Sequence, residues 1–404
     1  MDAPERFSGL PPYAFPRLRA LLEGVAPSSN AAVDMTIGDP RHPPPPFVAE
    51  AVARHAASFM SYPPNDGAPA LLEACADWLH RRYGYRADPG REILALNGTR
   101  EGLYNAAMAL CPERKNGERP VILTPNPFYQ VYAVAALAVA AEPIYVDANM
   151  ATGDLPRFAA LDSALLDRTA LVYVCSPANP QGAVASLDWW RDLLALAERH
   201  DFKILADECY SEIYRGDPPP GILEAVRAAG ADPERVVAFH SLSKRSNLAG
   251  LRAGFAVSGP GNMARMKLLR NYAGAPLPLP LQMAAAEVWA DEEHVRENRR
   301  LYRRKFEAAA EILPEAAIPD AGFFLWLPVP ARIGDGEAAA RRLWREAGVK
   351  VLPGAYLARD AGAGNPGAGF VRAALVGPQD EVVDGLTRLH ACLYDGGEGP
   401  WPTR

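Results

Sequence analysis

Short apolar runs and longer segments with a helical repeat alternate along most of the chain, from about residue 48 to 285. Each apolar run predicts a buried strand, because the strands of a parallel sheet are covered on both faces and carry few polar side chains. The strands predicted in this way are 93–96, 121–123, 171–175, 203–206 and 236–239. The helices predicted between them are 70–83, 98–111, 129–140 and 186–200. This alternation predicts an α/β fold with a mainly parallel central sheet and helices on both of its faces.

The pattern changes after about residue 285, where a long charged segment predicts one helix over 287–312. The strands and helices predicted beyond it are 323–327, 336–347, 370–375 and 379–393. This mixture is typical of a smaller α+β domain. Near the other end of the chain, residues 33–37 predict a short strand that precedes a stiff run of four prolines, 43–46.

The change of pattern predicts three parts. Residues 1–47 form an N-terminal arm that belongs partly to the small domain, residues 48–285 a large ligand-binding domain, and residues 286–404 a small C-terminal domain. A chain of this length is expected to divide in such a way, since one compact core rarely holds so many residues.

Composition and charge narrow the class of protein. The 404 residues carry 42 Lys and Arg against 48 Asp and Glu, a formal net charge of −6, and 49% of them are hydrophobic. This balance predicts a folded, soluble protein without a nucleic-acid partner, since nucleic acids are bound by basic surfaces. The longest apolar run, 131–141, is shorter than the roughly 20 residues that cross a membrane. No apolar stretch follows the acidic N-terminus, so we expect no membrane anchor and no secretory signal.

Residue types that commonly bind metals are scattered along the chain. The five cysteines are odd in number and form no CxxC pair, and no two of the seven histidines are spaced as a metal-binding pair. We therefore expect no metal site, no disulfide framework, and free thiols in a reducing cytoplasm. Residues 362–367 match the GxGxxG pattern of dinucleotide-binding proteins. Because this segment neither follows a predicted strand nor opens a predicted helix, we interpret it as a loop and disfavour a nucleotide-dependent dehydrogenase.

A lysine with polar and cationic neighbours follows the strand predicted at 236–239. It lies in the sequence Ser241-Leu242-Ser243-Lys244, and Arg252 comes eight residues after it. A lysine fixed at the end of a strand suits covalent catalysis through its amine. Two hydroxyl groups and one guanidinium beside it would suit a phosphate. The alternative for this segment is a surface turn rich in Ser, Lys and Arg.

Three further turns follow predicted strands. Asp207 comes directly after 203–206, and an Asp at the carboxyl end of a parallel strand points toward the crevice where such sheets bind ligands. Asn179 lies in the rigid turn Ser176-Pro177-Ala178-Asn179-Pro180, and Gly98 and Thr99 open a helix whose N–H groups suit a phosphate. The alternatives are an N-cap for Asp207 and ordinary strand-to-helix turns for the others.

Together and in this order, these segments resemble the class I and II aminotransferases, enzymes of fold type I that depend on pyridoxal 5′-phosphate. The resemblance covers nearly the whole chain and is most specific from Ser241 to Phe255. It implies the fold described above with a smaller α+β domain, pyridoxal 5′-phosphate as cofactor, an amino acid and a 2-oxo acid as small-molecule partners, and a homodimer.

The resemblance also implies catalytic roles. Lys244 would bind the cofactor covalently and move a proton at the substrate, and Asp207 would keep the ring nitrogen protonated. Tyr210 and Asn179 would hydrogen-bond the phenolic oxygen of the ring, and Asn179 would also border the substrate. These four residues follow three different predicted strands.

Binding roles are implied in the same way. The phosphate of the cofactor would be bound by Thr99, Arg100, Ser241, Ser243 and Arg252. Tyr129 would stack on the ring, and Tyr62 would reach the phosphate in the partner subunit. Arg372 would bind the α-carboxylate of the substrate through two parallel bonds, with Gly38 nearby.

Three segments, 12–22, 37–43 and 243–247, resemble the succinyldiaminopimelate aminotransferase subgroup of this family. This resemblance implies transfer of an amino group from L-glutamate to N-succinyl-2-amino-6-oxopimelate, a step in diaminopimelate and lysine biosynthesis. The distal carboxylates of that substrate need a further cation. The sequence leaves Arg17, Arg41 and Arg245 open for this role, each with the alternative of a solvated surface charge.

Other activities are known on the same scaffold, and fold alone does not decide among them. The alternatives are an aminotransferase for aspartate or aromatic substrates, a C–S β-lyase, and a cofactor-bound regulator. A regulator of this kind is expected to carry a DNA-binding segment, and no basic helix-turn-helix pattern precedes residue 48.

Overall fold

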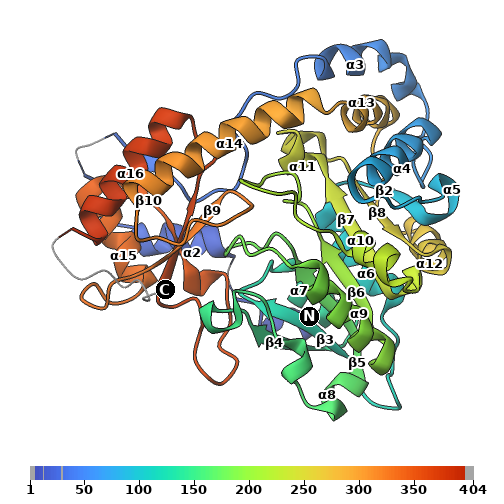
Figure 1. The fold of residues 1–404 in the computed structure, drawn as a ribbon, viewed down its shortest axis with the longest axis horizontal. Coiled ribbons are helices and arrows are strands. Elements are labelled where there is room, and N and C mark those ends of the chain that lie inside the picture. Colours follow the sequence, from blue (N-terminus) through green and yellow to red (C-terminus); the bar gives the residue numbers. More distant parts are fainter. Residues whose placement is uncertain (1–4, 12, 29–30, 396–404) are drawn as a thin grey trace.

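Seven strands form one sheet in the order β2-β8-β7-β6-β5-β3-β4 in the computed structural model, which describes residues 5–11, 13–28 and 31–395 (Figure 1). Their bounds are β2 Ile93–Leu96, β3 Val121–Asn126, β4 Glu142–Asp147, β5 Thr169–Cys175, β6 Lys203–Asp207, β7 Val236–Ser241 and β8 Gly254–Ser258. Neighbouring strands are parallel except where β8 takes part, since β8 is antiparallel to both β2 and β7. The predicted mainly parallel sheet is confirmed, and the five predicted strands lie within it.

Helices cover both faces of this sheet, as predicted. On one face lie α3 Val48–Arg54, α4 Pro69–Tyr83, α8 Ser163–Arg168, α9 Leu187–His200, α10 Ile222–Ala229 and α13 Leu279–Ala290. On the other face lie α6 Thr99–Leu110, α7 Val131–Ala138 and α12 Pro260–Arg270. Along β5, Val172 and Val174 pack into the first core while Leu171 and Tyr173 pack into the second. This alternation explains why the strand is an unbroken apolar run, because a strand buried on both faces has no position for a polar side chain.

The two strands that the apolar pattern does not reveal lie near the edges of the sheet. β4 lies at one edge of the sheet, its sequence begins with Glu142 and Pro143, and most of its residues are only half-buried. β8 lies between β2 and β7 and runs antiparallel to both of them. The alternation of apolar runs and helical segments does not predict such a strand. Both strands therefore depend on the neighbours that pair with them.

A smaller unit packs beside the large sheet around a core of its own, and Figure 1 shows it in orange and red. Its sheet has the order β11-β12-β9, with β9 Phe324–Pro328, β11 Leu352–Pro353 and β12 Phe370–Ala374. Its helices are α14 Glu293–Ile312, α15 Gly336–Arg342, the π-helical turn η6 Leu343–Ala347 and α16 Gln379–Leu393. The strands predicted at 323–327 and 370–375 and the helices predicted after residue 335 are thus found.

The single helix predicted over 287–312 is wrong. The chain leaves α13 at Asp291, which has an extended conformation, and α14 begins at Glu293. The carboxylate of Asp291 accepts a hydrogen bond from the backbone N–H of His294 at 3.1 Å, so it binds one of the free N–H groups at the start of the second helix. Helix α13 contributes Val288 and Trp289 to the core of the large unit, whereas α14 packs in the small one.

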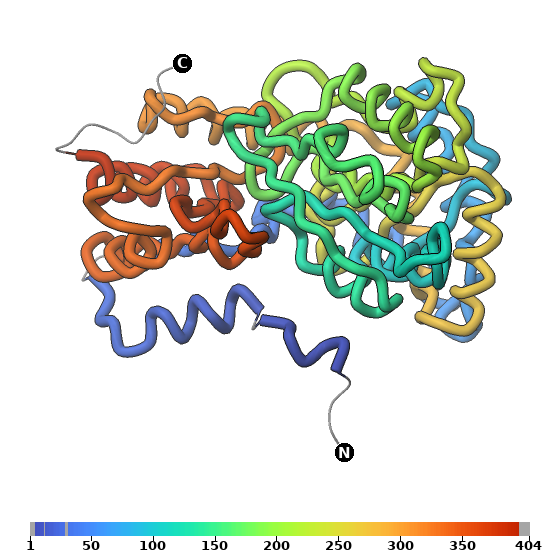
Figure 2. The backbone as a smooth tube through the Cα atoms, turned by 90° about the horizontal axis from the view of Figure 1, so that it is seen from below, coloured from blue at the N-terminus to red at the C-terminus, as the bar shows by residue number. Residues whose placement is uncertain are grey.

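Much of the N-terminal part of the chain packs against the small unit. Helices α1 Glu5–Ser8 and α2 Ala14–Leu22 run along one side of the molecule, shown in blue in Figure 2, and β1 Val33–Asp34 pairs in parallel with β10 Val349–Lys350. Residues 35–47, which we call the strap, lead from β1 across to α3, and the N–H of Ala374 in β12 donates to the carbonyl of Met35. The division of the chain at residues 47 and 285 stays a prediction.

The remaining elements are short. They are α5 Pro89–Glu92, α11 Leu242–Arg245, and the 3-10 helices η1 Ala56–Met60, η2 Met150–Thr152, η3 Phe158–Ala160, η4 Pro233–Arg235, η5 Ala249–Leu251 and η7 Gly354–Tyr356. Residues 362–367 lie in a loop, as predicted, and Asp360 accepts hydrogen bonds from the N–H groups of Gly362 and Gly364. Over the part of the chain that the structure describes, no helix is long and apolar enough to cross a membrane.

Candidate active site

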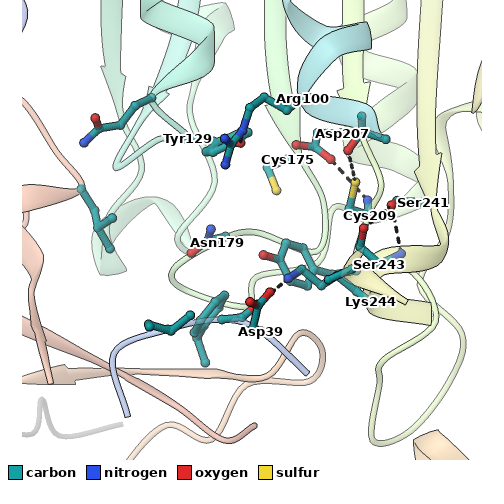
Figure 3. A pocket seen from close by; sticks show the side chains of 18 of the residues that line it. Asp39, Arg100, Tyr129, Cys175, Asn179, Asp207, Cys209, Ser241, Ser243 and Lys244 are labelled. Carbon is teal, nitrogen blue, oxygen red and sulfur yellow. Dashed lines mark hydrogen bonds between the residues drawn. The ribbon is translucent and has the colours of Figure 1, made fainter. Parts of the chain in front are cut away.

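A cavity of about 350 Å³ lies where β5, β6 and β7 end, beneath the strap (Figure 3). Twelve residues singled out in the sequence line it, namely Gly38, Thr99, Arg100, Tyr129, Asn179, Asp207, Tyr210, Ser241, Ser243, Lys244, Arg252 and Arg372. They come from both units and from positions more than 300 residues apart in the chain. The sheet brings most of them together because the carboxyl ends of neighbouring parallel strands meet at one edge.

The register of the central strands determines which residues lie at the base of the cavity. Cys175 at the end of β5 pairs with Asp207 at the end of β6, and Asp207 lies one strand from Ser241 at the end of β7. Helix α11 then starts at once after Ser241 and carries Lys244 over this edge. The position of the lysine thus follows from where β7 ends.

Lys244 extends into the cavity from α11, and its Nζ donates a hydrogen bond to the carbonyl of Gly38 in the strap. Burial lowers the pKa of the Lys244 amine to about 8, although the nearby carboxylate of Asp39 acts in the opposite direction. An amine with this pKa is partly neutral near physiological pH, and only the neutral form can attack a carbonyl carbon.

Asp207 lies beneath the lysine in a buried position. Its Oδ2 accepts a hydrogen bond of 2.8 Å from the hydroxyl of Tyr132, and its Oδ1 accepts one of 3.4 Å from the backbone N–H of Cys209. Tyr132 is itself held by stacking on Tyr173, with ring centroids 4.5 Å apart. Burial raises the pKa of the Asp207 carboxyl, while the two hydrogen bonds and the charge of Lys244 oppose that shift. A positively charged group placed beside this carboxylate would relieve the cost of its burial.

Arg372 reaches the cavity from β12 of the small unit and is only 5% exposed. Its Nη1 donates to the side-chain oxygen of Asn179 at 3.1 Å and its Nη2 donates to the carbonyl of Thr36 at 2.7 Å, while its Nε has no partner. The guanidinium lies over the ring of Phe324, 4.1 Å from the centroid. Burial lowers the pKa of Arg372 to about 10, so the group is charged at neutral pH. Among the described residues it forms no ion pair, and a buried cation in that state favours binding of an anion.

A cradle suited to a phosphate lies at the start of α6. No described side chain caps this helix, so the first N–H groups of Thr99 and Arg100 point toward the cavity with the positive end of the helix. Gly98 has a φ of 82°, and a Cβ at this position would lie 2.0 Å from Nη2 of Arg252. Only glycine therefore allows the guanidinium to close against the helix end.

Two serines complete this cradle. The hydroxyls of Ser241 and Ser243 are 3.0 Å apart, and the N–H of Ser243 donates to the hydroxyl of Ser241 at 3.1 Å. Arg252 donates to the carbonyl of Ala249 at 2.9 Å and forms no ion pair among the described residues. Hydroxyl groups, free helical N–H groups and one unpaired guanidinium together form a donor set without a negative charge, which fits a phosphate.

Aromatic side chains shape the walls of the cavity. The hydroxyl of Tyr129 accepts a hydrogen bond of 2.5 Å from Nε of Arg100, and the Tyr129 ring lies edge-on to Tyr132. Tyr210 packs against Phe323 and Phe324, with ring centroids 5.3 and 6.0 Å away. Burial raises the pKa of the Tyr210 phenol, so its hydroxyl keeps its proton as a hydrogen-bond donor at neutral pH.

Tyr62 does not join the cavity of its own subunit. Its side chain is fully exposed and lies beside a hollow lined by Phe59, Met60 and Leu279. The three cations considered for a distal carboxylate are also outside the cavity. Arg41 pairs with Glu381 at 2.5 Å, and Arg17 stacks on Tyr356, 3.8 Å from the ring centroid.

Arg245 corrects the expectation of a solvated surface charge or a substrate-binding cation. It is 2% exposed, and its Nη2 donates to a carboxylate oxygen of Glu292 at 2.8 Å. It also donates to the carbonyls of Val288 and Asp291 at the end of α13. Successive positions on a short helix point in different directions, so the residue after Lys244 is turned away from the cavity.

Some residues of the site escape sequence reasoning. Tyr132, Thr36, Asp39 and Cys209 line the cavity or hold residues that line it, yet none of them is marked by a strand end or a motif of its own. Tyr132 had one available signal, because it lies three residues after Tyr129 and therefore on the same side of a helix. The part of the chain that the structure describes contains no group of three or more His, Cys, Asp or Glu side chains arranged to bind a metal.

Comparison with known proteins gives consistent matches over most of the chain. A family model for aminotransferase class I and II matches residues 31–388. LL-diaminopimelate aminotransferase from Dehalococcoides mccartyi is 30% identical over 397 residues, which cover 96% of this chain and 98% of the relative. The LL-diaminopimelate aminotransferase from Desulforudis audaxviator is 31% identical, with 96% and 97% covered.

Solved structures give the same result. An aminotransferase from Neisseria meningitidis has a TM-score of 0.91 and 40% identity, with 96% of this chain and 99% of that chain covered. A probable N-succinyldiaminopimelate aminotransferase from Thermus thermophilus has a TM-score of 0.83 and 28% identity, with 94% and 100% covered.

Proposed function

The chain belongs to the class I and II aminotransferases, and on that premise we propose that it transfers an amino group between L-glutamate and N-succinyl-2-amino-6-oxopimelate. The observation that carries the proposal is one cavity lined by a half-buried lysine amine and by a buried arginine that has no carboxylate partner among the described residues. Similar proteins named for diaminopimelate and for its N-succinyl derivative support this choice of substrate skeleton.

Enzymes of this family use pyridoxal 5′-phosphate, and the residues of the cavity fit that group. The uncapped start of α6, the two serines and Arg252 suit its phosphate, and the buried carboxylate of Asp207 suits its ring nitrogen. When bound, the cofactor supplies a ring that accepts the electron pair released as the Cα proton of the substrate leaves.

Asp207 keeps a proton on the ring nitrogen. A carboxylate buried in this way stabilises a neighbouring cation strongly, because little water competes for either charge. The hydrogen bond from Tyr132 and the one from the N–H of Cys209 fix the orientation of the carboxylate. Tyr132 therefore acts through Asp207, as a positioning residue.

Lys244 provides the amine that binds the cofactor and, once displaced, moves the proton at Cα. Its lowered pKa means that loss of a proton costs little near neutral pH, which suits a general base. Gly38, whose carbonyl accepts from the amine, holds Nζ on the strap side of the cavity.

Arg372 binds the α-carboxylate of the amino acid. Two donors of its fork are occupied by Asn179 and Thr36, which hold the guanidinium in one orientation. The oxygen of Asn179 is used by Arg372, so its amide N–H₂ is the end available to the ring's phenolic oxygen. Tyr210, whose ring packs against Phe323, would offer its hydroxyl to the same oxygen.

The distal end of the proposed substrate carries two carboxylates and no ammonium group, because the succinyl group acylates the distal amine. Arg100 lines the cavity, and among the described residues it forms no ion pair. It is held by the hydroxyl of Tyr129, and its guanidinium lies over that ring, 5.8 Å from the centroid. We assign this cation to a distal carboxylate, in place of Arg17, Arg41 and Arg245.

A second candidate substrate is LL-diaminopimelate itself, because the curated relatives bear that name. Its distal end has an ammonium group, and Asp39 lines the cavity with a carboxylate that would suit such a cation. The two candidates thus differ in the charge that the distal end presents to Arg100 and Asp39.

We also propose a homodimer whose interface covers an apolar patch on the large unit. Met60 and Tyr62 are 91% and 102% exposed, and Phe59 lies beside them. A hollow of about 530 Å³ adjoins this patch. Large exposed apolar groups gathered in this way are typical of a protein interface. In such a dimer the partner subunit's Tyr62 would reach the phosphate cradle.

The test of the reaction is an amino-donor panel with 2-oxoglutarate as acceptor, in which formation of glutamate is measured. N-succinyl-LL-diaminopimelate is expected to give the highest kcat/KM, ahead of LL-diaminopimelate, aspartate and aromatic amino acids. Preference for unsubstituted LL-diaminopimelate would transfer the assignment to the second candidate. Release of pyruvate from cystathionine without transamination would instead indicate a C–S β-lyase.

Arg100→Ala tests the distal contact, with Arg41→Ala as the matched control because Arg41 is already paired with Glu381. We expect the KM for the succinylated donor to rise in Arg100→Ala and to stay unchanged in Arg41→Ala. An equal effect in both variants would contradict the assignment of Arg100.

Sedimentation velocity of the full chain and of Met60→Glu tests the dimer. We expect the variant to sediment as a monomer.

A further inference from the structure

The strap holds Lys244 and the turn after it at several points. The carbonyl of Gly38 accepts from Nζ of Lys244, and the carbonyl of Pro43 accepts from the side chain of Asn247 at 3.3 Å. Between these two points of the strap lies His42, whose ring joins the same turn through a third residue, Asn298 of α14. One short segment therefore contacts both the reactive end of the lysine and the turn that follows it.

Asn298 makes the link to the backbone of α11. Its Nδ2 donates to the carbonyls of Lys244 and Arg245 at 3.4 and 3.3 Å. These carbonyls lie at the end of a four-residue helix, where the helix itself provides no N–H partner. Asn298 is 4% exposed, so no water replaces its amide readily.

The side-chain oxygen of Asn298 determines which group donates in each hydrogen bond between Asn298, His42 and Lys305. Its Oδ1 is 2.8 Å from Nδ1 of His42 and accepts from Asn247 at 3.2 Å. Since Oδ1 can only accept, Nδ1 of His42 carries the proton and Nε2 is left as an acceptor. The amine of Lys305 lies 2.7 Å from this Nε2 and donates to it. Burial, and next the charge of Lys305, lower the pKa of His42 to about 4, which agrees with a neutral ring.

Lys305 is an unusual residue to bury in a core. It is 1% exposed on α14, where its amine lies over the ring of Tyr302 and beside the imidazole of His42. Among the described residues it forms no ion pair, and a buried lysine without one lowers stability. None of Lys305, His42 and Asn298 lines the cavity. The arrangement thus costs stability without contacting substrate or cofactor.

We propose that the hydrogen-bonded chain Lys305–His42–Asn298 is a positioning device that holds the backbone of α11 against the strap and so aims the Lys244 amine into the cavity. The three residues come from the small unit and the strap, whereas α11 belongs to the large unit. Gly38 belongs to the strap, as His42 does, and the backbone of Lys244 is held by Asn298, so the device sets the distance between Gly38 and Lys244. This inference rests on the proposed function, since it concerns the residue that the reaction uses.

The test compares Asn298→Ala with Asn262→Ala as matched control. Asn262 is 2% exposed and donates twice through its Nδ2, to the carbonyl of Glu234 and the hydroxyl of Ser258, and none of these three residues lines the cavity. Both variants remove one buried amide with two donated bonds, so a loss of stability is expected in both. We expect only Asn298→Ala to lower kcat, by roughly ten- to a hundredfold, because small misplacements of a catalytic group have effects of that size. The KM for glutamate is expected to stay unchanged, since Arg372 is not altered.

A second pair of variants at His42 separates the two bonds of its ring. In His42→Asn the amide N–H₂ takes the place of Nδ1 and can still donate to Asn298, whereas in His42→Gln the amide takes the place of Nε2 and that donor is lost. We expect kcat close to the wild-type value for His42→Asn and a decrease for His42→Gln. Both side chains are neutral amides, so stability alone would not separate them.

A readout without turnover completes the test. In the full chain freed of cofactor, labelling of the Lys244 amine by acetic anhydride is followed by peptide mass spectrometry as the pH is raised. We expect the midpoint of labelling to move upward in Asn298→Ala and His42→Gln, because a less confined amine is better hydrated and holds its proton longer. The midpoint in Asn262→Ala is expected to match the wild type.

The outcomes distinguish this inference from the proposed function. If the wild-type chain transfers no amino group from any donor, the proposed function fails, and the labelling midpoints still report on the device. If the wild type is active but Asn298→Ala and Asn262→Ala share one kcat and one labelling midpoint, the positioning device is refuted. Equal kcat in the two His42 variants would also contradict it.

Discussion

Lys244 and Arg245 are neighbours in the chain and both are cationic, but they lie on different sides of α11. Their surroundings differ in whether a carboxylate lies beside the cation. On the packing side, Arg245 has the carboxylate of Glu292 and the carbonyls that end α13. On the cavity side, neither Lys244 nor Arg372 forms an ion pair among the described residues. Arg372 and Arg245 are almost equally buried, at 5% and 2% exposed.

The comparison shows that burial of a cation does not reveal its role, whereas its partner does. A buried guanidinium with a carboxylate and two carbonyls has its charge balanced, and it holds α11 against α13. The Nε atoms of both arginines have no partner, but the Arg372 guanidinium has no carboxylate among the described residues, so its charge stays available for an anion that arrives later. The two sides of α11 are thus a structural side and a binding side.

Substitution of the lysine itself gives the clearest distinction between the two sides. Lys244→Ala is expected to lower kcat by about 10⁴-fold or more, since the nucleophile and base are lost together. It should also abolish the visible absorption band that borohydride bleaches. The measurements are transamination kinetics and the spectrum before and after reduction. A bleachable band in Lys244→Ala would show that another amine binds the cofactor.

The second prediction concerns the binding side alone. Arg372→Leu is expected to lower kcat/KM for glutamate by roughly 10²- to 10³-fold, because a bidentate, charge-assisted contact is lost. Arg372→Lys should act mainly on KM, since the charge remains but the fork does not. Glutamate half-reaction kinetics would measure both effects. Unchanged kinetics would mean that the carboxylate binds elsewhere.

The pH dependence of cofactor binding tests the difference in surroundings directly. With a pKa of about 8, the neutral fraction of the Lys244 amine rises about tenfold from one pH unit below that value to one above it, and then levels off. The rate of cofactor uptake by the cofactor-free chain is expected to follow this curve. A rate that continues to rise toward pH 10 would indicate an ordinary, exposed lysine.

The same shift has a consequence for folding in the cofactor-free chain. The unfolded chain binds a proton at Lys244 up to about pH 10.4, whereas the folded chain releases it near 8, so this group makes the folded state more stable as pH rises between those values. Lys244→Met is expected to remove that part of the pH dependence, as urea unfolding at several pH values would show.

The smallest effect is expected on the packing side. Glu292→Gln should lower the free energy of unfolding by roughly 1 kcal/mol, since the ion pair to Arg245 is partly exposed at Glu292. Kinetic constants should remain at wild-type values, because the bonds from Arg245 to α13 persist. Thermal unfolding and donor kinetics measure the two quantities. A loss of kcat without loss of stability would contradict the assignment of this side.

Much of the sheet follows from local pattern. The strands at 121–123 and 171–175 are unbroken apolar runs because each strand is buried on both faces, and the residues after them stand at strand ends. The edge strand β4 and the antiparallel β8 do not stand out, since their pairing depends on neighbours distant in sequence. The break at Asp291 is likewise set by a cap at the start of α14 and by Arg245 at the end of α13.

Lys244, Asp207, Asn179 and the start of α6 could be placed at the site from the chain alone, because the ends of parallel strands meet at one edge and each residue follows such an end or opens the helix behind it. Which cations stay free for an anion was decided by the folded molecule. Whether Arg245 or Arg372 has a carboxylate beside it depends on α13, the strap and β12, segments far apart in sequence that only packing brings together. For the same reason no motif marks Asn298 or Lys305.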